Sequence, residues 1–484
     1  MASSTATARE RTEISIRSTA RPVLMAGTLA LADICATGLA VILGFRVWSL
    51  FNPSIPPFQL VMSLAPIFCA AMFAFEGLYP GIGMGAVEHI RRVFRGITLI
   101  YLILTAAMFM TKDRSWADSR GGFFLSWAFS LAFAPAARWV SGQVFGRRPW
   151  WGVPVVILGA GETGRRIIRN LNTNRVLGYR PVVCLDDDPE KQGLFEGVPV
   201  VGALRDAADI AAEYRIQYAV IAMPGMPTAK LTRHLRTWST VFPNIVIIPD
   251  LFGIASLWIE TRDLGGVLGL EIRHNLLKPV NRWIKRAVDV VVAGAGLILI
   301  APFIPIVTLW IKLASPGRAF FVQAREGEHD KPIHILKFRT MFLNAEEMLE
   351  SHLAADPAAR AEWDQFCKLK NDPRVIPGIG ALLRKTSLDE LPQLWNILKG
   401  DMSLVGPRPF PAYHNGRFHP EFRSLRTQVR PGLTGMWQVN ARSDGDLGVQ
   451  ESFDSYYIRN WSLWLDLYLL IRTVRVVLSG QGAY

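Results

Sequence analysis

The chain has 484 residues, more than one ordinary domain holds and enough for two or three domains with separate hydrophobic cores. Half of the residues are hydrophobic, 19% are charged and the mean hydropathy is +0.22, so intrinsic disorder is excluded for most of the length. The formal net charge of +13 indicates anionic partners, but it does not by itself separate phosphates, acidic lipid headgroups and nucleic acid.

Residues 1–22 form an N-terminal tail rich in Arg, Ser and Thr. The apolar stretch that follows is too long for the core of a signal peptide, so we expect a retained cytoplasmic tail. Four scattered cysteines form neither a disulfide framework nor a CxxC metal motif, which also indicates a reducing compartment.

Residues 23–146 contain four apolar stretches, each close to the roughly 20 residues that a helix needs to cross a bilayer. The stretches are 23–45, 57–75, 93–110 and 122–140. We therefore predict a bundle of four transmembrane helices. The alternative is a buried, all-helical soluble core.

Arginine-rich segments set the expected orientation of these helices. One such segment precedes the first stretch, and another lies between the second and the third. A third marks the exit from the fourth stretch and contains Arg138, Arg147 and Arg148. They predict that both ends face the cytoplasm, although Lys112 and Arg114 in the third loop fit less well. Asp33, inside the first stretch, is expected to make a packing contact between helices.

Residues 147–275 have the pattern of a Rossmann-like α/β domain. An apolar strand at 153–158 opens into a glycine-rich turn and a helix, and a second strand ends at Asp186. Glycines at this spacing permit a tight turn and close phosphate approach, and an acid about 20 residues later reaches a ribose hydroxyl. The candidate cofactor-binding residues are Gly159, Gly161, Gly164 and Asp186.

Further strands are expected at 218–222 and 245–249, which completes the α/β unit. The same glycines also serve simply to pack a helix against a strand, so bound nucleotide is left open. No Tyr-x-x-x-Lys pair follows to relay protons, which argues against hydride transfer.

Residues 276–484 begin with a fifth apolar segment, 288–313, which Pro302 and Pro305 interrupt; the helix that contains this segment is expected over 284–313. Basic residues flank this segment on both sides, so both flanks are expected on the cytoplasmic face. Proline removes a backbone donor and bends a helix, which predicts a re-entrant helix that enters the membrane and returns. A kinked fifth crossing is the alternative.

Two cations follow on a predicted strand. Alternation places Lys337 and Arg339 on one face, where they form either an anion site or a solvated strand face.

The next polar cluster contains the adjacent acids Asp389 and Glu390. Ser387 and Glu390 have the spacing of a capping box, but Pro392 equally favours a helix that starts after the acids. Neighbouring carboxylates suit a division of labour, in which one binds Mg²⁺ and the other attacks phosphorus.

Two rigid turns each carry an arginine, Arg408 between prolines and Arg430 before Pro-Gly. A pre-ordered guanidinium binds phosphate in a bidentate manner. With the acid pair and the re-entrant segment, these turns predict phosphoryl transfer at a bilayer surface. Zinc-site, Walker A, hydrolase-elbow and kinase motifs are absent from the sequence, and nucleic-acid binding loses its support.

Five ordered motifs resemble the bacterial sugar transferase family, the monotopic polyprenyl-phosphate phosphoglycosyl transferases. The resemblance covers roughly residues 278–484, and the N-terminal part is similar to the long members of the WbaP type. The motifs are Lys285-Arg286-Ala-Val-Asp289, Ser315-Pro316-Gly317, Lys337-Phe-Arg339-Thr-Met341, Ser387-Leu-Asp-Glu-Leu-Pro-Gln393 and Leu404-Val-Gly-Pro-Arg-Pro409.

The resemblance implies transfer of a hexose-1-phosphate from a UDP-sugar to undecaprenyl phosphate, with Mg²⁺ and release of UMP. It implies that Asp389 is the nucleophile of a phosphosugar-enzyme intermediate and that Glu390 ligates Mg²⁺. Lys337 would neutralise phosphate charge, Arg408 would bind phosphate, and Asp454 matches an acid near the active site. Arg339 and Arg430 complete the expected substrate-binding set.

The resemblance also implies an integral protein of the bacterial inner membrane, with its catalytic domain on the cytoplasmic face. The fold class is then a four-helix transmembrane bundle, a cytosolic Rossmann-like domain and a C-terminal α/β domain with a re-entrant helix broken at Pro302. Ala301 stands where many relatives have Ser, so the break must rest on proline and packing. The Rossmann-like part resembles a non-catalytic domain, and a homodimer is expected.

Such enzymes begin O-antigen, capsule or exopolysaccharide synthesis. Galactose or glucose is the favoured sugar, although no sequence feature identifies it. Two other functions stay open: a membrane-anchored NAD-dependent nucleotide-sugar dehydratase or epimerase, and a non-enzymatic assembly scaffold.

Overall fold

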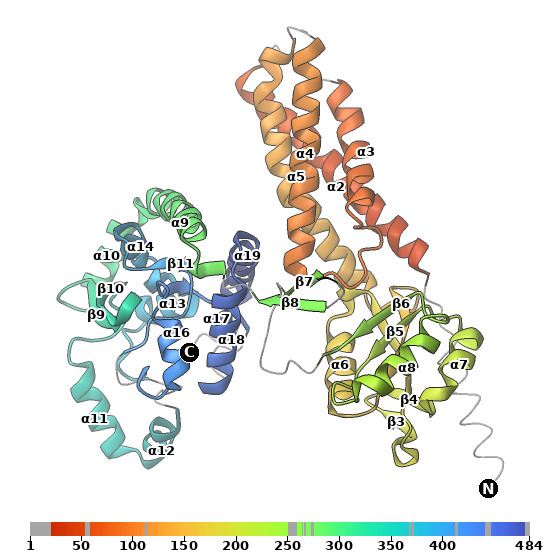
Figure 1. Ribbon diagram of the computed structural model, residues 1–484. Coiled ribbons are helices and arrows are strands. Elements are labelled where there is room, and N and C mark those ends of the chain that lie inside the picture. The colour runs from red at the N-terminus through yellow and green to blue at the C-terminus, as the bar shows by residue number, and fades with distance from the viewer. Residues whose placement is uncertain are drawn as a thin grey trace. The chain divides into compact units, whose positions relative to one another are not determined.

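The structure is a computed structural model with two compact units, Met1–Phe252 and Gly253–Tyr484 (Figure 1). The residues it describes are 21–53, 59–111, 115–249, 259–263, 265, 268–272, 275–366, 369, 372–411, 415–440 and 447–479. Residues 1–20 of the predicted tail, and Lys112 and Arg114 of the third loop, lie outside the described residues.

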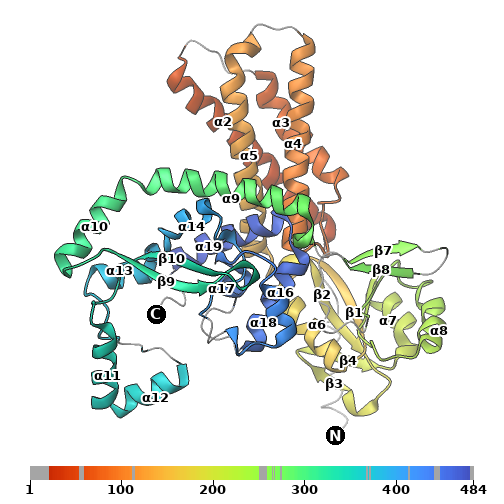
Figure 2. The same ribbon diagram turned by 60° about the vertical axis from the view of Figure 1, so that its left-hand side comes forward.

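Four helices open the first unit and lie side by side (Figures 1 and 2). They are α2 (Pro22–Phe51), α3 (Gln59–Phe75), α4 (Ala86–Thr111) and α5 (Ser115–Phe145). Three are long and apolar enough to cross a membrane, namely Pro22–Phe51, Ala86–Met110 and Arg120–Phe145. The apolar part described for α3, Leu64–Phe75, is shorter.

A buried ion pair joins the first and last of these helices. Arg138 Nη2 lies 2.6 Å from Asp33 Oδ2, and Tyr79 donates a 2.7 Å hydrogen bond to the same oxygen. Asp33 therefore makes the packing contact expected of it. Arg138, one of the arginines at the exit from the fourth stretch, is only 3% exposed and neutralises Asp33.

A six-stranded sheet forms the α/β part of the first unit. Its strands are β1 (Val153–Leu158), β2 (Tyr179–Leu185), β3 (Gly193–Phe195), β4 (Val198–Gly202), β5 (Tyr218–Ile221) and β6 (Asn244–Ile247). The order is β3-β4-β2-β1-β5-β6, with every pairing parallel except β3 with β4. The helices that follow its strands are α6 (Glu162–Thr173), α7 (Ala207–Tyr214) and α8 (Thr228–Trp238). The four predicted strands are confirmed.

The second unit begins with a hairpin of β7 (Ile259–Asp263) and β8 (Leu268–Ile272), which pair with each other. Its helices are α9 (Pro279–Ile300), α10 (Phe303–Ala314), α11 (Ala345–Ala355), α12 (Pro357–Phe366), α13 (Ile379–Thr386), α14 (Gln393–Lys399), α16 (Pro420–Arg426), α17 (Met436–Asn440), α18 (Leu447–Asn460) and α19 (Leu463–Ser479). Two small sheets complete it: antiparallel β9 (Phe320–Glu326) with β10 (Pro332–Phe338), and parallel β11 (Ser403–Val405) with β12 (Gly432–Thr434).

A break at Ala301 and Pro302 separates α9 from α10, and the two helices are bent by 60° (Figure 2). Because Pro302 has no backbone N–H, the hydrogen-bond ladder is interrupted at the predicted position. Large apolar side chains remain exposed along both helices, as Val291, Leu299 and Phe303 illustrate. These two helices therefore present a hydrophobic face that the unit itself does not cover.

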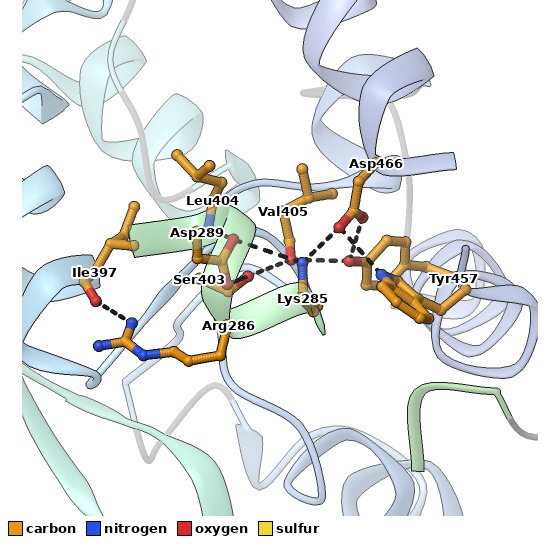
Figure 3. A network of polar contacts seen from close by, with 10 residues as sticks. Lys285, Arg286, Asp289, Ile397, Ser403, Leu404, Val405, Tyr457 and Asp466 are labelled. Atoms are coloured by element: carbon orange, nitrogen blue, oxygen red, sulfur yellow. Dashed lines mark hydrogen bonds and ion pairs between the residues drawn. The ribbon is translucent and has the colours of Figure 1, made fainter. Parts of the chain in front are cut away.

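Buried charges fasten α9 to the rest of the unit (Figure 3). We call Lys285, Asp289 and Asp466 the α9 charge network. Lys285 Nζ lies 2.7 Å from Asp466 Oδ2 and 3.8 Å from Asp289 Oδ1, and all three side chains are less than 10% exposed. Asp289 also accepts hydrogen bonds from the Ser403 hydroxyl (2.7 Å) and the Leu404 amide (3.1 Å), so α9 holds the start of β11.

We expect Lys285→Met to lower the free energy of unfolding by about 3–5 kcal/mol, because it leaves two buried carboxylates without their cation. Denaturant unfolding in detergent micelles, followed by tryptophan fluorescence, measures this change. Lys278→Met, at an exposed lysine just before α9, is the matched control and should change stability by less than about 0.5 kcal/mol. Equal losses in the two variants would contradict the assignment.

Candidate active site

The two predicted acids lie in a single 3₁₀ turn, Leu388–Glu390, between α13 and α14. Ser387 has a left-handed backbone (φ 56°) and its side chain does not cap the turn, so the capping-box interpretation fails. Pro392 is instead the residue immediately before α14. The chain thus presents Asp389 and Glu390 as neighbouring carboxylates ahead of a helix.

Glu390 is held by two cations. Its Oε1 accepts a hydrogen bond from Lys337 Nζ at 2.7 Å and one from Arg408 Nη2 at 3.0 Å. Burial alone would raise the pKa of Glu390, but Arg408 and Lys337 overcome it and lower that pKa to about 2. Glu390 is therefore a fixed anion at neutral pH.

Asp389 differs in having no hydrogen bond or ion pair from its carboxylate to any side chain in the described part of the chain. Burial, and then repulsion from Glu390, raise the pKa of Asp389 to about 6. Its carboxylate is consequently ionised at pH 7, more basic than an ordinary aspartate and not engaged by a cation. These are the properties of a nucleophile.

Lys337 is positioned by a buried asparagine. Asn396, in α14, accepts a hydrogen bond from the Leu336 amide (2.9 Å) and donates one to the His334 carbonyl (2.7 Å). The Asn396 side chain pairs in this way with the edge of β10 beside Lys337. Helix α14, which follows Asp389 and Glu390, therefore also positions β10, the strand that carries Lys337.

Arg408 is positioned from two sides. Asp289 holds β11, which leads directly into the turn that carries Arg408. The guanidinium of Arg426, only 6% exposed, donates to the Arg408 carbonyl and to Asn415, and lies 4.8 Å from the centre of the Phe410 ring. The loop is therefore ordered before any phosphate arrives.

The remaining predicted site residues lie apart from Glu390. Asp454 is buried and its Oδ2 lies 3.8 Å from Arg426 Nε, while burial raises its pKa to about 6. It is thus joined to Arg408 through Arg426. Arg430 Nε lies 3.3 Å from Glu328.

Lys337 lies in β10, but the strand ends at Phe338, so Arg339 lies beyond it. The two cations therefore do not share a strand face as predicted. The buried guanidinium of Arg339 donates to the carbonyls of Ser315 and Pro316 and so fastens the turn after α10. Gly317 has φ +112°, and a Cβ there would lie 2.8 Å from Arg339 Nη1. The positive φ, which residues with a Cβ rarely adopt, explains the glycine of the Ser-Pro-Gly motif.

Sequence reasoning missed Asn396 and Arg426. Both are polar residues within short helices, and neither stands in a recognisable motif. Their importance arises from burial, at 3% and 6% exposure, which local sequence does not reveal.

In the first unit, the candidate ribose-binding acid Asp186 is hydrogen-bonded to the glycine-rich turn itself. Asp186 Oδ2 accepts a 2.7 Å hydrogen bond from the Ala160 amide within the turn, and Lys191 lies 3.4 Å away. A Cβ at Gly164 would lie 2.1 Å from the Gly159 carbonyl oxygen, so this glycine is required for packing. Gly161 differs, because a Cβ there would meet no described atom within 4 Å.

Among the described residues there is no group of three or more His, Cys, Asp or Glu side chains suited to a metal ion. Mg²⁺ is commonly held by one or two carboxylates together with substrate phosphates. Asp389 and Glu390 supply hard oxygen donors of this kind, and Glu390 Oε1 alone contacts both cations. The residues present therefore fit a Mg²⁺ ion that arrives with a phosphate substrate.

Fold and site together define a membrane-associated α/β protein with two adjacent carboxylates, one of which is held by two cations. Residues 280–480 match the family described as Bacterial sugar transferase, and residues 75–249 match one described as CoA-binding domain.

Curated relatives resemble the chain over most of its length. An undecaprenyl-phosphate galactose phosphotransferase of Salmonella typhimurium is 34% identical, with 82% of both chains covered. A UDP-galactose-lipid carrier transferase of Erwinia amylovora is 31% identical over 97% of this chain and 99% of its own. A UDP-glucose:undecaprenyl-phosphate glucose-1-phosphate transferase of Escherichia coli is 33% identical over 68% of each chain. The chain belongs to the bacterial sugar transferase family, of the long WbaP type, and is an enzyme.

Neutralising the two acids should change stability in opposite directions. The raised pKa of Asp389 gives stability below its unfolded value of about 3.9 that is lost as pH rises through about 6. At pH 7 Asp389→Asn should therefore raise the free energy of unfolding by roughly 2–3 kcal/mol.

Glu390→Gln should lower that free energy by roughly 3 kcal/mol at pH 7, because the lowered pKa gives stability above pH 4.5 that is lost toward pH 2. Urea unfolding of both variants at pH 7 provides the measurement. Shifts of the same sign would refute the assigned division between the two carboxylates.

Proposed function

We propose that the protein transfers a hexose-1-phosphate from a UDP-sugar to undecaprenyl phosphate and releases UMP. The observation that carries this proposal is the contrast between the two acids. Glu390 is fixed by Lys337 and Arg408, whereas the neighbouring Asp389 is unpaired among the described side chains and has a pKa of about 6.

The reaction has two displacements at one phosphorus atom. In the first, an Asp389 carboxylate oxygen attacks the sugar-bearing phosphorus and the bond to the bridging oxygen breaks, which releases UMP. In the second, a phosphate oxygen of undecaprenyl phosphate attacks the same phosphorus and the bond to Asp389 breaks. The carboxylate is regenerated, and the product is undecaprenyl-diphosphate sugar.

The cations have separate roles in this scheme. Lys337 and Arg408 hold Glu390 and balance the negative charge of the diphosphate. Bound through Glu390 and substrate phosphate, Mg²⁺ would supply further charge neutralisation for the leaving UMP. Asp454 acts through Arg426 as a positioning residue, and Arg339 and Arg430 act on the surrounding turns.

The membrane arrangement belongs to the same proposal. We infer that all four N-terminal helices cross the bacterial inner membrane and that α9 and α10 form a re-entrant hairpin on its cytoplasmic side. The 60° bend and the uncovered apolar face of these helices support this arrangement, since a lipid substrate must bring its phosphate to the bilayer surface.

The named relatives favour galactose or glucose as the sugar. An exopolysaccharide or O-antigen pathway is the context that we propose, and a further relative, from Rhizobium meliloti, is an exopolysaccharide production protein. A homodimer remains part of the proposal. UMP release measured with UDP-galactose, UDP-glucose and the N-acetylated donors would identify the sugar.

The alternative of an NAD-dependent dehydratase or epimerase is not favoured. Asp186, which would have to reach a ribose hydroxyl, is bonded to the glycine-rich turn itself and to Lys191. The assembly scaffold is not favoured either, because Ser387 does not cap the turn that carries the acids.

A trapping experiment tests the covalent step. Wild-type protein incubated with Mg²⁺ and UDP-sugar labelled in the phosphate next to the sugar, without undecaprenyl phosphate, should release about one UMP per active site and retain the label. Asp389→Asn should do neither. Label retained by Asp389→Asn would overturn the assignment of the nucleophile.

The first displacement should depend on pH through Asp389. Only the ionised carboxylate attacks, so single-turnover UMP release should fall about tenfold per pH unit below about 6 and level off above it. Glu390 stays ionised to about pH 2 and is not the cause. A rate that is constant between pH 4.5 and 7 would contradict this role.

A further inference from the structure

A polar pocket lies within the first unit, whereas the acid pair belongs to the second. The volume of the pocket is about 350 Å³, and it lies between the segment after α5 and the amino-terminal ends of β2 and β4. Residues that line it include Arg148, Trp151, Arg175, Tyr179, Arg180 and Glu196.

This pocket is not the nucleotide site of a Rossmann-like fold. Ligands of such folds bind at the carboxyl ends of the parallel strands, where the turn at Gly159 lies. The pocket is lined by residues near the opposite ends, Tyr179 to Val182 of β2 and Val198 and Pro199 of β4. It therefore needs a separate explanation.

The pocket carries an excess of positive charge. Arg148, Arg175 and Arg180 have no carboxylate partner within the described ranges. The one acid in the lining, Glu196, is already paired, with Arg169 at 2.8 Å and Arg165 at 3.4 Å.

Arg175 and Arg180 are held by backbone oxygens. Arg175 Nε donates to the Asn172 carbonyl at 3.2 Å, and Arg180 Nη1 donates to the Pro149 carbonyl at 2.5 Å. Burial, and then the neighbouring charge of Arg175, lower the pKa of Arg180, so the two cations repel each other without compensation.

Trp151 also lines the pocket. It is 4% exposed, and its buried indole N–H has no hydrogen-bond partner among the described residues. The arginine side chains of the lining donate hydrogen bonds but do not accept them, so they suit a ligand rich in acceptors and negative charge.

The chain also places the pocket next to an apolar helix end. The membrane-length segment Arg120–Phe145 ends one residue before Gly146, the first residue of the lining. Trp150 and Trp151 follow, and their rings lie 5.6 and 6.5 Å from the Phe145 ring. Tryptophan and arginine just beyond an apolar helix are typical of the headgroup layer.

We propose that this pocket binds a phosphate group, with Arg148, Arg175 and Arg180 as its cationic ligands, and that the phosphate belongs to an anionic phospholipid headgroup. The same chemistry would admit a soluble phosphate ester. The position beside the end of α5 favours the lipid. This site is independent of the acid pair and of the reaction proposed for it.

Native mass spectrometry of the full-length protein in detergent tests the proposal. The protein is titrated with phosphatidylglycerol and, in parallel, with phosphatidylcholine, glycerophosphoglycerol and inorganic phosphate. We expect phosphatidylglycerol to bind more tightly than the other three. Arg175→Gln and Arg180→Gln should each weaken its binding about tenfold, as expected for the loss of a charge-assisted hydrogen bond.

Arg147→Gln is the matched control, because this exposed arginine has the same charge and is adjacent to Arg148 but does not line the pocket. It should change binding by about twofold or less at physiological salt. Arg175→Lys, which keeps the charge, should retain much of the affinity, and unchanged thermal unfolding shows that the variants fold.

The outcomes are distinct. Equal losses in Arg147→Gln and Arg175→Gln would show general surface charge and overturn the site. Tight binding of glycerophosphoglycerol or inorganic phosphate, with the same arginine dependence, would keep the phosphate site but overturn the lipid assignment. No arginine-dependent binding of any of the four probes would overturn the proposal entirely.

Discussion

The α9 charge network is the constraint on which the second unit depends. A lysine and two aspartates that are almost wholly removed from water are tolerated only if each charge finds a partner, and this requirement fixes α9 against β11 and α19. Exposed apolar side chains lie along α9, and the buried Asp289 of the same helix holds the strand that leads to Arg408. The proposed membrane attachment and the proposed phosphate site therefore share one element.

The side chains around the two adjacent carboxylates, Asp389 and Glu390, give them different pKa values. Lys337 and Arg408 both reach one oxygen of Glu390, and this convergence leaves Asp389 without a cation of its own. At Asp389, burial and the charge of Glu390 outweigh the attraction of Lys337 and Arg384, so the pKa of Asp389 rises while that of Glu390 is lowered. The difference does not come from the residues themselves, since both are ordinary acids in sequence.

Local pattern was enough to predict much of this architecture. The strand at 153–158 and the break at Pro302 follow from apolar runs and from proline chemistry, which are properties of short segments. The acids and Arg408 were also found, because motifs keep them in rigid turns. The ion pair of Arg138 with Asp33 was not predicted, and Asn396 and Arg426 were missed, because their roles depend on which distant groups are buried beside them. A sequence pattern locates an arginine along the chain, but it does not show whether a distant carboxylate pairs with it in the folded protein.

The hydrogen bond between Asp186 and the Ala160 amide has a consequence for how the first unit is made. In a nucleotide-dependent fold, the exposed amides of a glycine-rich turn gain their acceptor only when the ligand arrives. Here the acceptor is encoded in the same chain, at the end of the next strand. The Ala160 amide thus has its acceptor as soon as β1 and β2 pair, and a ligand at this turn would have to compete with Asp186 for it.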